Sequence, residues 1–561
     1  MAVDSPFAPT GGVAVLPPQA ALTSRWQRWD ELLDWLSELL NPIVVKEARQ
    51  ALKSKQFTIT FGLLLVFGAC WTALGVALQM PAVFHSPSGP FMVAGYYVIL
   101  AVPLLVIVPF AAFRSLAAER EDGTFELLSI ATLSARQVVL GKLASAMLQM
   151  VVYYSAIAPC IAFTYLLRGL DIITIGLMLA YLFLASTALS ALGLALATVT
   201  KEKHWQVLLS VVLVAALVFT FWIWIWGMAA LFAMFLNYSP FDQPDFWMFN
   251  VALVMFHASF MTLFMYVAAG QISFASDNRS TPVRWVLFVQ HAFWFGWMMY
   301  GMFLEEEMFF VLGASIALIY WWIAGSFLIG ERADLSPRVR RQLPQSFAGR
   351  MLLTWFNPGS GTGYFFALTN FGMFILALCF GSNMIEWTSG KPGNFIDNER
   401  MWRFAGAAWL ILATYLGVGR LMVILVRNRV PSGVVFSFLL QIVLVTFGTL
   451  IPLVVQLSLF GANNFDYTAL QITNPFWTLG EMLFAYNSIA SDMTLVFLLL
   501  AIAGIVLIGT HFLLTVKEVE QTRLVAPTRV RQEDEALVAA RTPIRKKNPW
   551  DDPQPTSPPR I

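Results

Sequence analysis

Charged residues are scarce in this chain. Of its 561 residues, 12% are Asp, Glu, Lys or Arg and 58% are hydrophobic, whereas soluble domains are roughly half apolar and a quarter charged. This composition excludes an ordinary soluble protein, because so apolar a chain needs an apolar solvent. The net charge of +2 creates no field that would attract nucleic acid, so no nucleic-acid partner is expected.

Cysteine is rare, and motifs for catalysis are missing. Cys70, Cys160 and Cys379 lie in separate hydrophobic runs without ligand spacing, which predicts packing roles. The glycine run 359–363 lacks the lysine with which a P-loop reaches nucleotide phosphates. We therefore predict that the chain is not an enzyme, has no catalytic or metal-binding residues, and holds no cofactor itself.

Long apolar runs fill most of the sequence. A bilayer core about 30 Å thick is crossed by roughly 20 apolar residues in a helix. The runs predict an all-α transmembrane bundle of about twelve helices, at 58–80, 92–113, 144–167, 172–199, 206–236, 247–274, 285–304, 308–329, 364–385, 402–426, 432–460 and 493–516.

Basic residues are distributed unevenly around these helices. If the N-terminus is cytoplasmic, only Arg168, Lys391, Arg400 and Arg403 of the 35 Lys and Arg residues fall on the outer side. The excess of positive charge inside fixes the orientation, and an even helix number puts both termini in the cytoplasm. We expect an integral protein of a bacterial-type inner or plasma membrane.

The helices group into two similar halves, with a long inner loop after the second helix of each. The resulting division has five parts: a disordered tail at 1–23, interfacial amphipathic and basic helices at 24–57, six-helix units at 58–274 and 275–516, and a cytoplasmic tail at 517–561. Related halves are typical of transporters. No residue-level repeat accompanies them, so this relation depends on hydropathy alone.

The segment before the first crossing has the pattern of an interfacial helix. Ser24 and Gln27 form a capping box, and apolar residues recur at helical spacing up to Leu40. Asn41 and Pro42 end the pattern, and a basic stretch follows that suits anionic headgroups. An ordinary membrane-anchoring flank explains these features equally well.

The inner loop after the second helix carries the most specific pattern. It contains Glu119, Arg120, Glu121, Asp122, Gly123, Thr124, Phe125, Glu126, Leu127 and Leu128, and Gly141-Lys142 follows in the third helix. Gly123 can end one helix and Thr124 can cap a short new one. Ser134 and Gln137 predict a capping box at the start of the third helix.

This arrangement resembles the permeases of ABC-2 type exporters, as does the start from Asn41-Pro42 to Lys46-Glu47 and Arg49. The resemblance covers residues 41–235 well and the rest by helix count. It implies a separate ABC ATPase subunit that binds the ATP, and a loop at 119–128 that docks on this ATPase and transmits its closure. We expect Glu119 and Glu121 to form a charged docking surface for it. Membrane lipids and a second permease or a homodimer are the further partners expected. The alternative interpretation of the loop is a solvated charged turn.

Other features favour packing over function. Ser186, Ser190, Gly193 and Ala197 form a small-residue stripe that permits close helix approach. Gln441 and Gln456 are typical of interhelical hydrogen bonds, although a polar cavity would also explain them. The apolar segment 474–479 predicts a re-entrant loop. His257 and His291 lack a second ligand at metal spacing.

The helix centres are almost free of charged residues, which disfavours a proton- or sodium-coupled carrier. The sequence therefore favours an ATP-driven exporter with lipid-like or otherwise apolar cargo. A non-transporting membrane scaffold or assembly factor, whose loop recruits another protein, is the alternative.

Overall fold

The computed structural model describes residues 42–121, 134–199, 203–238, 240–273, 278–305, 307–333, 335, 340, 343–344, 346–353, 355–389, 398–429, 433–461, 467–484, 490–522 and 528–541. These residues form helices and connecting turns, and no strand occurs among them. The predicted segments 1–23 and 543–561, together with the interfacial pattern up to Leu40, lie outside the described residues.

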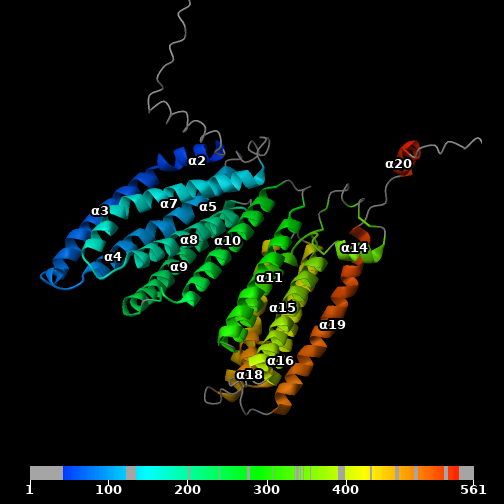
Figure 1. Cartoon of the computed structure of the whole chain (residues 1–561). Coiled ribbons are helices and arrows are strands. Elements are labelled where there is room, and N and C mark those ends of the chain that lie inside the picture. Colours follow the sequence, from blue (N-terminus) through cyan, green and yellow to red (C-terminus); the bar gives the residue numbers. More distant parts are fainter. Residues whose placement is uncertain are drawn as a thin grey trace, which may run out of the picture. The chain divides into compact units, whose positions relative to one another are not determined.

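The chain divides into two compact units, Met1–Ala269 and Gly270–Ile561. The elements of unit 1 are α2 (Pro42–Leu52), α3 (Lys55–Gln79), η1 (Ala82–Phe84), α4 (Gly89–Val102), η2 (Pro103–Ile107), α5 (Val108–Glu121), α7 (Ala135–Leu166), α8 (Ile172–Ala197), α9 (Lys203–Asn237) and α10 (Pro244–Ile272), the last of which ends just past the boundary. Within this unit the long helices lie alongside one another (Figure 1).

Unit 2 consists of α11 (Ser280–Glu305), α12 (Glu307–Leu328), α14 (Phe347–Leu353), α15 (Ser360–Ser389), α16 (Asn398–Arg427), α17 (Val434–Phe460), η3 (Ala469–Thr473), α18 (Pro475–Phe484), α19 (Ala490–Thr522) and α20 (Thr528–Arg541). The short helix α18 packs on α16 in the segment expected to be re-entrant. Its depth in a membrane stays a prediction.

Eleven of the described helices are long and apolar enough to cross a membrane, with α4, η2 and α5 counting as one span. Several leave most of their surface uncovered within the chain: only 6% of the most apolar part of α17 is buried, and 11% of that of α9 and of α10. Exposed Trp222 and Trp226 belong to these surfaces. The protein is thus an all-α integral membrane protein whose uncovered helix faces suit lipid.

Helix α11 corresponds to a predicted crossing but is not among these eleven apolar spans. Its 26 residues would extend about 39 Å at 1.5 Å per residue, and it packs against α12 and α15. Its lower hydropathy arises from Arg284, Gln290 and His291, all of which are buried inside unit 2.

In both units, the second span contacts the same set of neighbouring helices. In unit 1 the span α4–η2–α5 contacts the first, third, fourth and fifth long helices, and in unit 2 α12 does the same. The second span is therefore the centre of each unit.

A proline pair explains how α8 packs on this centre in unit 1. The Val108 N–H bonds to the Pro103 carbonyl in the π-turn η2, and Pro109 has no N–H, so the Leu104 carbonyl lacks a helical donor. Ser186 Oγ donates to it at 2.5 Å. A Cβ on Gly193 would lie 2.9 Å from the Pro109 carbonyl. The small-residue stripe is a packing surface, as predicted.

Candidate functional site

The predicted coupling segment begins in the last turn of α5. Glu119, Arg120 and Glu121 end this helix, whereas residues 122–133, including Asp122 to Leu128 and the predicted turn at Gly123, lie outside the described residues. The structure resumes at Ser134, whose Oγ accepts from the Gln137 backbone N–H at 3.3 Å while Gln137 Oε1 accepts from the Ser134 N–H at 2.8 Å. The capping box predicted for the third helix is confirmed.

A buried lysine holds the base of this segment. Lys142 Nζ lies 3.2 Å from Glu47 Oε1 and 3.1 Å from Glu119 Oε2, and it donates to the Ser115 carbonyl at 3.3 Å. The lysine side chain is 1% exposed. We name Glu47, Glu119 and Lys142 the Lys142 cluster. One ammonium faces two carboxylates here, so each charge has a partner, as burial requires.

The Lys142 cluster connects three helices. Glu47 belongs to α2, Glu119 to α5 and Lys142 to α7. Gly141, the residue before Lys142, allows α2 to approach α7 closely. A Cβ at this position would lie 2.6 Å from Ile43 Cγ2 of α2. The Gly-Lys pair seen in the sequence therefore has two physical roles: glycine admits α2, and lysine ties α2 to α5.

This placement corrects one expectation about the loop. Glu119 was expected to present an exposed charge to a partner, but its side chain is only 15% exposed and faces Lys142. Glu121 is an exposed residue at the end of the helix, although its side chain is 21% exposed and pairs with Arg114 at 3.7 Å. Glu121 is thus somewhat more accessible to another protein than Glu119 is.

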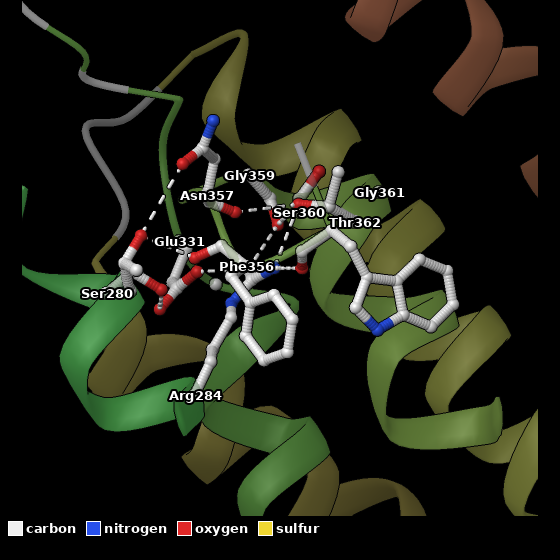
Figure 2. A network of polar contacts seen from close by, with 12 residues as sticks. Ser280, Arg284, Glu331, Phe356, Asn357, Gly359, Ser360, Gly361 and Thr362 are labelled. Carbon is white, nitrogen blue, oxygen red and sulfur yellow. Dashed lines mark hydrogen bonds and ion pairs between the residues drawn. The ribbon is translucent and has the colours of Figure 1, made fainter. Parts of the chain in front are cut away.

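Unit 2 contains a larger network at the start of α15 (Figure 2). The Arg284 side chain, 0% exposed, extends from α11, and its Nη2 lies 2.6 Å from Glu331 Oε2. Nη1 donates to the Trp355 carbonyl at 2.9 Å and to Thr362 Oγ1 at 3.1 Å, and Nη2 donates to the Gly359 carbonyl at 3.2 Å. Arg284 thereby binds the chain just past α12 to the turn that opens α15.

A second arginine approaches the same turn from α16. Arg420 Nη2 lies 3.1 Å from Glu518 Oε2 of α19, and Nη1 lies 3.0 Å from His511 Nδ1. The same Glu518 oxygen accepts from the Gly361 N–H at 3.0 Å. A carboxylate is favourable at this position because the N-terminus of a helix carries partial positive charge.

We name Arg284, Glu331, Arg420 and Glu518 the α15 cluster. The glycine run lies at its centre, and a Cβ on Gly361 would come within 2.7 Å of both Arg420 Nη2 and Glu518 Oε2. Glycine here makes room for side chains from neighbouring helices. The run that lacks the P-loop lysine therefore has a structural role in helix packing.

Sequence reasoning did not identify the α15 cluster. Arg284 fell one residue outside the crossing predicted at 285–304, and Glu518 fell beyond the crossing predicted to end at 516. Arg420 lay inside a predicted crossing, and an arginine in an apolar run was the available signal that it has a buried partner.

The other polar residues noted in the sequence form hydrogen bonds between and within helices. Gln441 Oε1 accepts from Trp322 Nε1 at 3.3 Å, and its Nε2 donates to the Tyr415 carbonyl at 2.9 Å. Gln456 Oε1 accepts from Gln471 Nε2 at 2.7 Å. The interhelical role favoured for both glutamines is confirmed.

Both clusters consist of ion pairs at helix ends, an arrangement suited to joining helices rigidly. Within the described part of the chain, no three His, Cys, Asp or Glu side chains are grouped to hold a metal ion. No family model, curated protein or solved structure matches this chain.

Proposed function

We propose that this chain is the membrane-spanning permease subunit of an ATP-driven exporter of the ABC-2 type, and that a separate ATPase subunit docks on it. The chain then crosses a bacterial-type inner membrane twelve times, with both termini in the cytoplasm. Helix α11 is the crossing that is added to the eleven apolar spans. Support comes from the eleven apolar spans and from the spanning length of α11.

The observation that carries the proposal is the Lys142 cluster. Segment 122–133 connects α5 to α7, and the ion pairs of Lys142 tie the last turn of α5 and the first turns of α7 to α2. A force on the segment would therefore act on three helices together. Transport driven by another subunit requires such a connection, because hydrolysis outside the membrane must move spans inside it.

The α15 cluster supports a similar connection in unit 2. Its Glu331 follows the end of the second span, as Glu119 ends the second span of unit 1, and each glutamate is paired with a buried cation. A scaffold needs a loop that recruits its partner, but it needs no rigid junction between that loop and the spans. This difference favours the exporter over the scaffold.

Affinity isolation of the full chain in mild detergent tests the proposal. We expect a P-loop ATPase to copurify and to be lost when Glu121 and Asp122 are both changed to lysine. Glu119 is left intact because reversing its charge would disrupt the Lys142 cluster. Glu305→Lys with Glu306→Lys, on the proposed outer face, is the matched control. Copurification of other proteins without an ATPase would favour the scaffold.

A further inference from the structure

A second group of polar side chains lies deep inside unit 2, away from the α15 cluster. Gln290 and His291 of α11 and Asn370 of α15 each lie about ten residues from the start of their helix, or about 15 Å along it. Half the thickness of a bilayer core is also about 15 Å. These side chains are therefore at the middle depth of the spans.

Contacts place the three residues in one interface. His291 Nδ1 accepts from Trp321 Nε1 of α12 at 2.9 Å, and the His291 ring packs on Phe374, one turn beyond Asn370 on α15. Gln290 Oε1 accepts from Tyr320 Oη at 3.1 Å. Helices α11, α12 and α15 thus meet around a group of neutral polar side chains, which we name the midspan site.

Two atoms of the midspan site have no hydrogen-bond partner. Gln290 Nε2 is a donor and Asn370 Oδ1 is an acceptor, and both residues are 2% exposed. The other amide groups of the two side chains are satisfied, because Asn370 Nδ2 donates to the Phe366 carbonyl at 2.7 Å. Buried polar groups without partners are rare and costly, and many such groups bind a small molecule or water.

The chemistry of the site restricts what it can bind. The nearest charged side chain along α11 is Arg284, about 10 Å toward the helix start, and Glu331 already pairs with it. A charged guest would thus lack a counter-charge at a depth where charge is costly. A hydroxyl is neutral and can accept from an amide N–H or donate to a carbonyl oxygen, which are the two kinds of atom that are unpartnered here.

We infer that the midspan site binds the hydroxyl group of a neutral guest, which is either water or a lipid-like alcohol. The surroundings of the site are aromatic and apolar, since the His291 ring packs on Phe374 at 4.8 Å between centroids and Phe374 contacts Phe295 at 6.1 Å. Binding does not require the ATPase. If the guest is an alcohol, the site also gives the cargo class of the proposed exporter.

Photolabelling of the full chain in nanodiscs tests the alcohol. The probe is octanol that carries a diazirine, and the control probe is the same chain without the hydroxyl. We expect saturable labelling of the α11 and α15 peptides around 287–295 and 366–374 by the alcohol alone. Asn370→Leu and, independently, Gln290→Met should weaken it about fivefold, the factor that corresponds to one hydrogen bond of ~1 kcal/mol.

Radiolytic footprinting tests water, because irradiation splits bound water into hydroxyl radicals that oxidise the side chains beside it. We expect oxidation at Trp321 or Phe374 in the unlabelled protein, and less of it in both variants. Gln441→Leu is the matched control, since Gln441 is a buried amide in the same unit with both ends partnered. Specific labelling identifies an alcohol site, and footprinting without labelling identifies water. Absence of both signals in wild-type protein would overturn the inference.

Discussion

Replacing Lys142 by methionine removes the one buried positive charge between two carboxylates. Glu47 and Glu119 would keep 10% and 15% side-chain exposure and lose the Nζ atom that lies 3.2 and 3.1 Å from them. Removing one partner of a buried ion pair typically costs about 3–5 kcal/mol. We expect a loss of stability in this range, because water reaches neither carboxylate freely.

The neighbouring lysine is a matched control. Lys46 lies 3.8 Å from Glu119 Oε1, but its side chain is 60% exposed. An exposed pair of this kind contributes about 0–1 kcal/mol, and solvent screening places it at the low end. Lys46→Met therefore removes the same charge, with the same new side chain, at almost no cost.

Thermal unfolding of the full chain in nanodiscs, followed by fluorescence-detected size exclusion, measures the difference. Adding Glu47→Gln and Glu119→Gln to Lys142→Met should recover most of the lost stability, because neutral amides can be buried without a counter-charge. Equal effects of Lys46→Met and Lys142→Met, or no recovery in the triple variant, would refute the electrostatic account of the cluster.

Three further predictions concern the fold. Gly361→Ala should destabilise the chain by about 1–3 kcal/mol through steric overlap in the α15 cluster, whereas Gly509→Ala, with open space around it, should be neutral or stabilising in the same unfolding assay. Arg420→Met should lower the stability of the chain by about 3–5 kcal/mol, because it leaves Glu518 without its cation. Arg403→Met is the control and should lower it by under about 1 kcal/mol, since its partner Glu399 is 81% exposed. Similar losses of stability in the two variants would contradict the assigned burial. Reporter fusions after Val83, Pro240 and Phe395 should all lie outside the cell, and an inside signal at Phe395 alone would show that α11 does not cross.

Hydropathy was sufficient to predict the helical fold, because membrane spans are long and apolar regardless of their partners. Hydropathy was less accurate in placing the residues at which helices begin and end. Arg284 and Glu518 extend α11 and α19 beyond the predicted crossings, since their charges lower the local hydropathy although both are satisfied by ion pairs in the folded chain.

The candidate site was only partly predictable. Ser134 and Gln137 form a capping box because the interaction is local, so spacing alone reveals it. The Lys142 cluster joins Glu47 to a lysine far along the chain, and no spacing rule brings α2 beside α7. The Gly141-Lys142 pair was noted in the sequence, but the sequence did not show that Gly141 lies against Ile43, because this contact depends on how α2 packs on α7.

The central claim is that segment 122–133 transmits ATPase movement to the spans. The most direct measurement is ATP hydrolysis by the copurified ATPase in vesicles that contain wild-type chain or Gly123→Val. We predict that this variant keeps the ATPase bound but abolishes the stimulation of hydrolysis by the chain, because a β-branched residue opposes the left-handed turn expected at Gly123. Full stimulation by Gly123→Val, equal to that of wild type and of the control variant with both Glu305→Lys and Glu306→Lys, would contradict the account.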